Sequence, residues 1–275
     1  MAGNAGQVER AGGAIAYEVI DHVPPWLTPA RTVLFHHGLG TRSVCWDGWT
    51  PALAGRHRLV RFDMRGHGAS PLPAGFRWSL SALVDDLLAV ADATGAERFH
   101  LVGESTGGTV ALAVAARLPE RVLSVTVSNG AHRGGSIRNL EPWRRIIREE
   151  GMEAWSAHMM GQRFFDGALT DGMRRWYETR QADSDPDAIL GATAMLVAVD
   201  LLPELERVTC PVLLLHPDSS PFIPVETMAE LKRALPDARL QVFADARHGL
   251  PFSHAAECAA AVAEFIDRAS PAEHS

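Results

Sequence analysis

Residues 99–117, FHLVGESTGGTVALAVAAR, join three patterns in one continuous run. An apolar, β-rich segment leads into the pentapeptide G-E-S-T-G, and a sequence typical of a helix follows. In this context G-x-S-x-G predicts a sharp turn between a strand and a helix, with the serine exposed at the turn. The glycines are needed because side chains there would collide with neighbouring backbone. The pattern predicts Ser105 as a nucleophile; a merely structural glycine-rich turn is the alternative.

Two backbone amides are expected to bind an oxyanion beside this serine. The amide of Thr106 opens the predicted helix and would add the positive end of the helix dipole. A second glycine-rich segment, His37-Gly38-Leu39-Gly40, follows a predicted strand and offers the amide of Leu39. Two amides are the usual minimum for a tetrahedral intermediate. A glycine-rich connection between strand and helix is also compatible with these residues.

Outward from the pentapeptide, short β-rich segments alternate with longer helical patterns. The clearest helix covers residues 79–94, where the apolar positions share one face and Gly95 follows as a stop signal. Alternation of this kind predicts an α/β fold with a mainly parallel sheet covered by helices on both faces. The predicted strands are residues 32–36, 58–62, 99–103, 122–128, 211–215 and 240–243.

The pattern changes between the fourth and fifth predicted strands. Residues 135–205 are helical and rich in tryptophan and methionine, and they predict an inserted helical cap on a catalytic core formed by residues 1–134 and 206–275. These side chains fit a small hydrophobic core. Alternatively, the inner face of the cap forms the apolar wall of a substrate pocket. The aromatic and methionine side chains concerned are Trp143, Trp155, Met159, Met160, Trp176 and Met195.

A general base for Ser105 is expected in the loop after the last predicted strand. His248 lies there, before the C-terminal helix, at the sheet edge where the serine turn also opens. A neutral imidazole can take the serine proton and return it to a leaving group. His254 is the nearest rival and fits a residue flanking the final helix.

These motifs together resemble the α/β-hydrolase superfamily across almost the whole chain. His37-Gly38 is similar to its oxyanion loop, residues 63–70 (DMRGHGAS) to its D-x-R-G-x-G-x-S turn, residues 103–107 to its nucleophile turn and residues 246–249 (ARHG) to the surroundings of its catalytic histidine. Within the superfamily, the turn DMRGHG at residues 63–68, the nucleophile turn GESTGG at residues 103–108 and the phrase GMEA at residues 151–154 look most similar to 3-oxoadipate enol-lactonases and related carboxylic-ester hydrolases.

The resemblance does not supply an acid for the histidine. The family usually places an aspartate after the strand that corresponds to residues 211–215, and Ser220 stands at that position here. Some relatives use an acid after the preceding strand, where this chain has Asn129. We expect Asp218, two residues before Ser220, to orient His248, although aspartate beside proline and serine is also a common turn residue. Asn129 and Ser220 are the uncharged alternatives.

Composition narrows the class of partner. The formal net charge is −7, and no dense lysine or arginine run occurs, so a small-molecule substrate is expected rather than nucleic acid or an anionic membrane. The three cysteines form no CxxC pair, and no clustered ligand spacing indicates a metal or a cofactor. The sequence also lacks a secretion signal or a long apolar run, so a cytoplasmic protein is expected; its oligomeric state is open.

The leading hypothesis is a serine hydrolase of a small carboxylic ester or lactone that needs no cofactor. The resemblance implies an enol-lactone of aromatic degradation as the most specific substrate. Hydrolysis of a carbon–carbon bond in a ring-cleavage product uses the same fold and nucleophile and is the alternative reaction. Because no carboxylate stands at either usual acid position, a non-catalytic binder of small molecules is the alternative from another class.

Overall fold

The computed structural model describes residues 4–10, 13–27 and 30–269. Its centre is an eight-stranded sheet with the order β1-β2-β4-β3-β5-β6-β7-β8, in which the strands from β3 to β8 pair in parallel and β1 and β2 join one edge antiparallel. The predicted fold class and its six strands are confirmed. The strands are β1 (Asn4–Arg10), β2 (Gly13–Ile20), β3 (Arg31–His36), β4 (His57–Phe62), β5 (Phe99–Glu104), β6 (Val122–Ser128), β7 (Val212–Pro217) and β8 (Ala238–Phe243).

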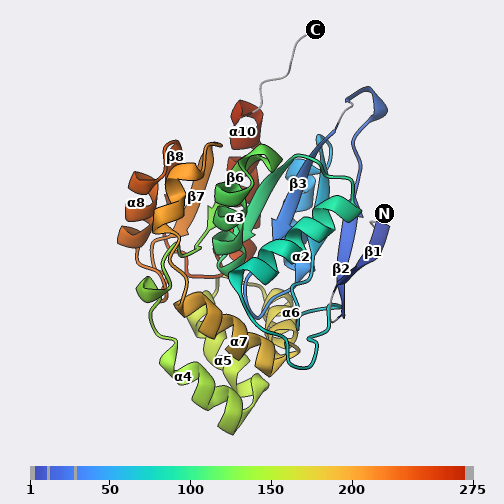
Figure 1. The fold of residues 1–275 in the computed structure, drawn as a ribbon. Coiled ribbons are helices and arrows are strands. Elements are labelled where there is room, and N and C mark those ends of the chain that lie inside the picture. Colours follow the sequence, from blue (N-terminus) through green and yellow to red (C-terminus); the bar gives the residue numbers. More distant parts are fainter. Residues whose placement is uncertain (1–3, 11–12, 28–29, 270–275) are drawn as a thin grey trace.

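Helices cover both faces of this sheet (Figure 1). Side chains of a strand alternate between faces, so Leu34 of β3 joins one hydrophobic cluster while its neighbours Val33 and Phe35 join the other. The first cluster packs under α2 (Leu80–Ala93), α3 (Thr106–Arg117) and α8 (Val225–Ala234). The second packs under α1 (Thr50–Leu53) and α10 (Ala255–Ala269), with the short α9 (Leu250–Ser253) before it.

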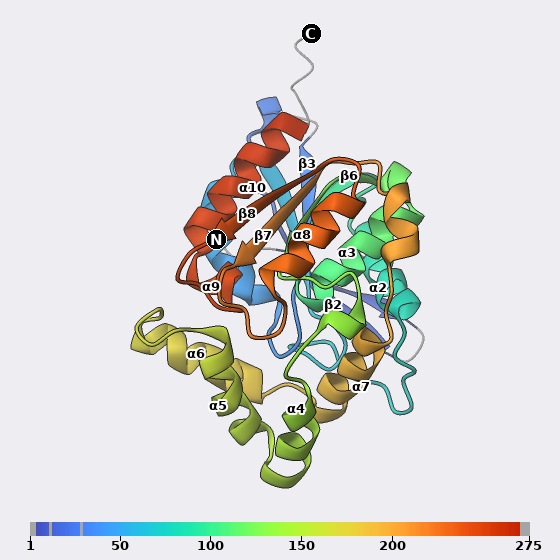
Figure 2. The same ribbon diagram turned by 90° about the vertical axis from the view of Figure 1, so that its left-hand side faces the viewer.

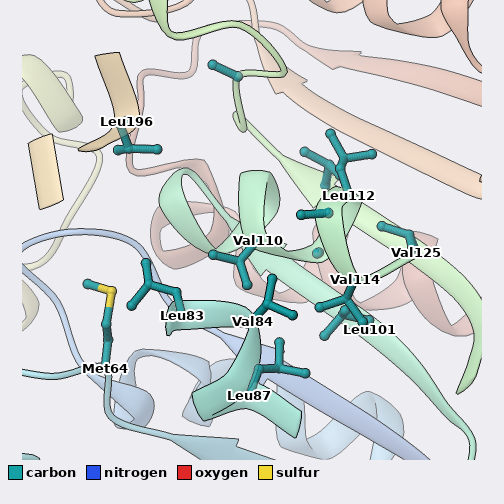
Figure 3. Packing of buried hydrophobic residues seen from close by; sticks show 14 of the residues in the cluster. Met64, Leu83, Val84, Leu87, Leu101, Val110, Leu112, Val114, Val125 and Leu196 are labelled. Carbon is teal, nitrogen blue, oxygen red and sulfur yellow. The ribbon is translucent and has the colours of Figure 1, made fainter. Parts of the chain in front are cut away.

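Figure 3 shows how α2 and α3 pack against the middle of the sheet. Leu83 and Leu87 of α2, Val110 and Val114 of α3 and Leu101 of β5 belong to one hydrophobic cluster, and all five are almost completely buried. Burial of each such side chain contributes about 1.5–3 kcal/mol. The helix predicted over residues 79–94 is therefore held by the apolar stripe from which it was predicted, and the hydroxyl of residue 79 caps its first turn at 3.1 Å from the amide of residue 82.

The chain between β6 and β7 forms four helices that gather at one end of the sheet (Figures 1 and 2). Trp155, Met159 and Leu196 from this segment belong to the same hydrophobic cluster as Leu101 of β5, so the insertion packs onto the main core. The limits 135–205 for a separate cap stay a prediction. The helices are α4 (Glu141–Arg145), which continues into a π-helical turn (Ile146–Glu150), α5 (Met152–Arg163), α6 (Asp171–Ala182) and α7 (Pro186–Val197).

Candidate active site

Ser105 occupies a strained turn between β5 and α3. Its backbone angles are φ 51° and ψ −113°, a region that non-glycine residues rarely adopt and that costs about 1–3 kcal/mol. The turn closes only with glycine beside it, because a Cβ at Gly103 would lie 2.2 Å from the Gly107 carbonyl oxygen, and one at Gly107 would lie 2.1 Å from the His36 carbonyl oxygen. The Ser105 amide donates to Ser128 O of β6 at 2.8 Å, which fixes the turn against the sheet.

The loop between β8 and α9 brings His248 to this serine. The imidazole Nε2 lies 3.2 Å from Ser105 Oγ, and the residue is only 4 % exposed. Burial lowers the pKa of His248 well below its ordinary value of 6.5, and the positive charge of Arg163 and the nearby His216 lower it further. The imidazole is therefore neutral at pH 7, which is the state a general base requires.

The other ring nitrogen of His248 meets a hydroxyl group instead of a carboxylate. Ser220 Oγ lies 3.1 Å from His248 Nδ1 and also accepts the Ile223 amide at 3.3 Å. When Nδ1 carries the proton, it donates to Ser220 and leaves Nε2 free to accept from Ser105. A hydroxyl can also donate to Nδ1, which would favour the opposite tautomer, whereas a carboxylate can only accept. Ser220 therefore orients the ring, but it selects the tautomer with the proton on Nδ1 less strongly than a carboxylate would.

Asp218 does not contact the imidazole, which corrects the expectation from the sequence. Its exposed carboxylate accepts the backbone amides of Asp245 at 3.0 Å and Ala246 at 3.2 Å. Asp218 directly follows β7, and its own amide donates to Phe243 O at the end of the neighbouring β8. At this position the side chain can close the turn that precedes His248, but it faces that turn and not the ring.

Asn129 supports the backbone of the histidine loop. Its side-chain amide donates to His248 O at 2.6 Å, and Ser128 Oγ donates to Asn129 Oδ1 at 2.9 Å. Asn129 directly follows β6 and has a positive φ of 49°, and its hydrogen bond to His248 O shows that its side chain is turned toward the loop. It therefore holds the main chain at His248, whereas the alternative raised from the sequence was a hydrogen bond to the imidazole.

The two expected oxyanion donors, Leu39 and Thr106, both lie on the wall of a pocket that also contains Ser105 and His248. Thr106 begins α3, where the amides of the first turn have no acceptor within the helix. Within the described residues, the Leu39 amide donates to no backbone carbonyl. Both amides are thus available to a ligand at Ser105.

The rest of this pocket is mainly apolar and narrow, with a free volume of about 30 Å³. Trp143 and Met159 line it, so part of the insertion does form its wall. Trp176 is not on the wall and stacks on Phe252 with ring centroids 5.6 Å apart and planes inclined by 8°. The other apolar wall residues include Ile137, Leu140, Leu196, Phe222 and Ile223.

Comparison with known proteins identifies the family. Residues 33–261, most of the chain, match the alpha/beta hydrolase family. The protein belongs to that family. A 2-hydroxymuconate semialdehyde hydrolase of Pseudomonas sp. (strain CF600) is 30 % identical over 249 residues, covering 86 % of this chain and 87 % of the relative. A pimeloyl-[acyl-carrier protein] methyl ester esterase of Methylococcus capsulatus is 29 % identical over 262 residues, covering 85 % and 94 %.

A solved structure supports the same assignment for this alpha/beta hydrolase. The enol-lactonase from Burkholderia xenovorans LB400 superposes with a TM-score of 0.81 at 26 % identity, covering 96 % of this chain and 99 % of the other. Because these relatives are named as hydrolases and esterases, the chain is a hydrolase. That finding disfavours a non-catalytic binder.

Two charged residues of this alpha/beta hydrolase site were missed by sequence reasoning. Arg163, 2 % exposed, lines the pocket from the last residue of α5, and Glu104, 3 % exposed, precedes the serine. Burial raises the pKa of Glu104, and Arg163 opposes that shift. The sequence signal for Arg163 is its spacing of four residues from Met159 and Trp155, which places all three side chains on one face of α5. Because the other two are apolar core residues, this spacing indicates that the arginine is buried as well.

In the part of the chain that the structure describes, the histidine, cysteine and carboxylate side chains form no group of three that could hold a metal ion. None of its helices combines the length and apolarity that a bilayer crossing requires.

Proposed function

We propose that this alpha/beta hydrolase cleaves a small carboxylic ester or lactone through an acyl-enzyme on Ser105. The observation that carries the proposal is the 3.2 Å approach of His248 Nε2 to Ser105 Oγ at a pocket lined by Leu39 and Thr106. A strained, half-buried serine on a pocket wall beside a neutral buried imidazole is the arrangement that activates a hydroxyl nucleophile. The small-molecule substrate is the only partner that this chemistry requires.

The reaction follows from these positions. Ser105 Oγ attacks the substrate carbonyl while His248 Nε2 takes the hydroxyl proton, and the amides of Leu39 and Thr106 hold the oxyanion. His248 then gives that proton to the departing alkoxide. Water adds to the acyl-enzyme by the same route in reverse and releases the carboxylic acid. In a lactone the departing alkoxide stays attached to the acyl group, so ring opening gives one product.

The shape of the site favours a compact apolar acyl group. The narrow pocket shares Leu140, Trp143 and Thr193 with a wider groove between α4 and α7, whose volume is about 470 Å³. The groove offers room for a leaving group or a distal part of the substrate. The likeness to the enol-lactonase supports a lactone substrate, and the esterase relative supports an open-chain ester.

Hydrolysis of a carbon–carbon bond is the second candidate. The relative named 2-hydroxymuconate semialdehyde hydrolase is the observation in its favour, since it matches over 86 % of this chain. A dienoate ring-cleavage product would then lose its characteristic absorbance on incubation with the protein. An ester or lactone hydrolase would leave that spectrum unchanged.

A labelling experiment tests the proposed nucleophile. The protein is treated with a fluorophosphonate, and the modified peptide is identified by mass spectrometry. An activated serine reacts quickly, so we expect one adduct on Ser105 and loss of activity toward p-nitrophenyl esters and lactones in the same proportion. Turnover that persists in the fully labelled protein would refute a Ser105 acyl-enzyme. The ester and lactone panel then ranks the substrate classes.

A further inference from the structure

The last residue of α5, Arg163, binds the loop that carries the Leu39 amide. Its Nη2 donates to Leu39 O at 2.6 Å, and its Nη1 donates to Tyr177 Oη at 2.9 Å. The same Nη1 lies 3.7 Å from Glu104 Oε1, which makes an ion pair between two almost fully buried side chains. Arg163 therefore connects the helical insertion, the oxyanion loop and the residue before Ser105.

Glu104 completes the connection from the opposite side of Leu39. Its Oε2 accepts the Gly38 amide at 3.3 Å, so the ion pair binds the loop at Gly38 N and at Leu39 O. The amide of Gly40, which shares a peptide group with Leu39 O, donates to His67 Nε2 at 3.1 Å. Loop residues 38 and 40 are glycines, whose backbone would otherwise rotate freely.

These bonds restrict the peptide that carries the Leu39 N–H. Its carbonyl, Gly38 O, lies 2.7 Å from His37 Nδ1. In a trans peptide the N–H points away from the carbonyl, so fixing Gly38 O aims the Leu39 N–H to the opposite side. The ion pair holds the peptides on either side. Each of the three peptide groups around Leu39 thus has a buried polar partner.

We propose that the Glu104–Arg163 ion pair is a positioning device that keeps the Leu39 amide aimed at the oxyanion, which makes α5 of the insertion part of the catalytic apparatus. Arg163 serves here because a guanidinium donates in two directions from one rigid group, which an ammonium on a flexible chain does not reproduce. Its backbone also accepts the Gly249 amide at 2.9 Å, beside His248. The end of α5 therefore anchors the oxyanion and histidine loops together.

This inference rests on the proposed function, and its test uses two readouts on the full chain. The first is kcat and KM on p-nitrophenyl butyrate. The second is affinity for butylboronic acid, in which Ser105 Oγ bonds to boron, His248 accepts the serine proton and a boron hydroxyl occupies the oxyanion position. Affinity for butyrate, a ground-state ligand, is the internal reference.

We expect Arg163→Met and Arg163→Lys to lower kcat by about 10²–10³-fold with little change in KM, as loss of an oxyanion donor does. Boronic acid affinity should fall by a similar factor, while butyrate affinity stays within about threefold. Glu104→Gln should show the same pattern more weakly, because its amide oxygen can still accept from Gly38. A wild-type kcat in the Arg163 variants, or a fall in kcat with unchanged boronic acid affinity, would overturn the inference.

Removing one partner of a buried ion pair can unfold a protein, because the remaining charge is left unpaired. The double variant Glu104→Gln/Arg163→Met removes both charges, and we expect it to fold and to show the full kcat loss. Arg61→Met is the matched control. Arg61 of β4 is 6 % exposed, forms an ion pair with Glu18 of β2 at 2.6 Å and does not line the pocket, so its loss should lower only stability. If wild-type protein neither turns over the ester nor labels at Ser105, the proposed function fails; if it does both and the double variant matches wild-type kcat, only this inference fails.

Discussion

The turn at Ser105 and the loop of residues 218–224 between β7 and α8 both contact the same imidazole, but they are specified in different ways. At the serine turn, sterics determine each position: glycine stands wherever a Cβ would collide with backbone, and the serine accepts a strained conformation. In the other loop, one side chain decides how His248 is oriented, and the chain carries Ser220 there instead of an acid. Steric requirements tolerate no substitution, whereas an orienting group can be exchanged at a cost in rate.

This difference has an electrostatic consequence. A carboxylate beside Nδ1 would raise the pKa of His248 and stabilise the imidazolium formed during the reaction. The hydroxyl of Ser220 does neither, and the positive charge of Arg163 adds to the effect of burial in lowering the pKa of His248. The part of the site around Ser105, the serine half, is therefore complete. The part around Ser220, the orienting half, holds the imidazole in place but supplies no negative charge to stabilise the imidazolium.

The largest effect should come from the serine half. Ser105→Ala removes the nucleophile, and we expect kcat/KM on p-nitrophenyl esters to fall by about 10⁴-fold or more. The side chain packs little, so circular dichroism and thermal unfolding should match wild type. Activity within about tenfold of wild type would end the account of Ser105.

His248→Ala should be almost as damaging. Loss of the base disables the serine, since members of such a site act as one unit, and a fall of about 10³-fold or more is expected in kcat. The same substitution should slow fluorophosphonate labelling of Ser105 in parallel. A residual rate above about a tenth of wild type would place the base at another residue.

The pH profile separates the two halves. Because burial lowers the pKa of His248 well below 6.5, the imidazole stays neutral to lower pH than an ordinary histidine, so wild-type kcat/KM should fall less between pH 7.5 and pH 5.5 than it would with an unshifted base. A base of ordinary pKa would retain about a tenth. In Ser220→Asp the new carboxylate raises the pKa, so the acid limb should move to higher pH. Identical profiles for the two proteins would contradict the missing countercharge.

A smaller effect is expected from the two insertion tryptophans. Trp143 lines the pocket, so Trp143→Ala should change KM or acyl-chain preference by about 1–3 kcal/mol. Trp176 packs on Phe252 away from the pocket, so Trp176→Ala should lower the melting temperature without altering specificity. Both are measured with an ester series and thermal unfolding. Equal specificity in both variants would show that Trp143 is only a core residue.

The sequence predicts most features of the fold that follow from local chemistry. Five of the six predicted strands and the helix over residues 79–94 carry apolar patterns that the structure buries, whereas the side chains of β8 are exposed or half-buried. The glycines at the serine turn mark a conformation that only a few residues permit. The hairpin β1–β2 was missed because β1 is an edge strand with mostly exposed or half-buried side chains, which leaves no apolar run to detect.

The orienting half of the site was harder to predict because it depends on side-chain direction across a loop. Asp218 and Ser220 are two residues apart, and only the structure shows that the first faces the turn at Asp245 while the second faces His248. Arg163 was missed for a related reason. Its partners, Glu104 and Leu39, lie 59 and 124 residues away in the chain, so no local pattern links them.

The central claim is that Ser220, and not Asp218, orients the histidine that activates Ser105. Its most direct test is kcat/KM on one p-nitrophenyl ester for Asp218→Asn and Ser220→Asp beside wild type, with circular dichroism to confirm each fold. We expect Asp218→Asn to stay within about threefold of wild type, because it touches only backbone amides, and Ser220→Asp to raise kcat/KM by about tenfold by selecting the productive tautomer. A loss of about 10⁴-fold in Asp218→Asn, the cost of removing a true triad acid, would contradict the account.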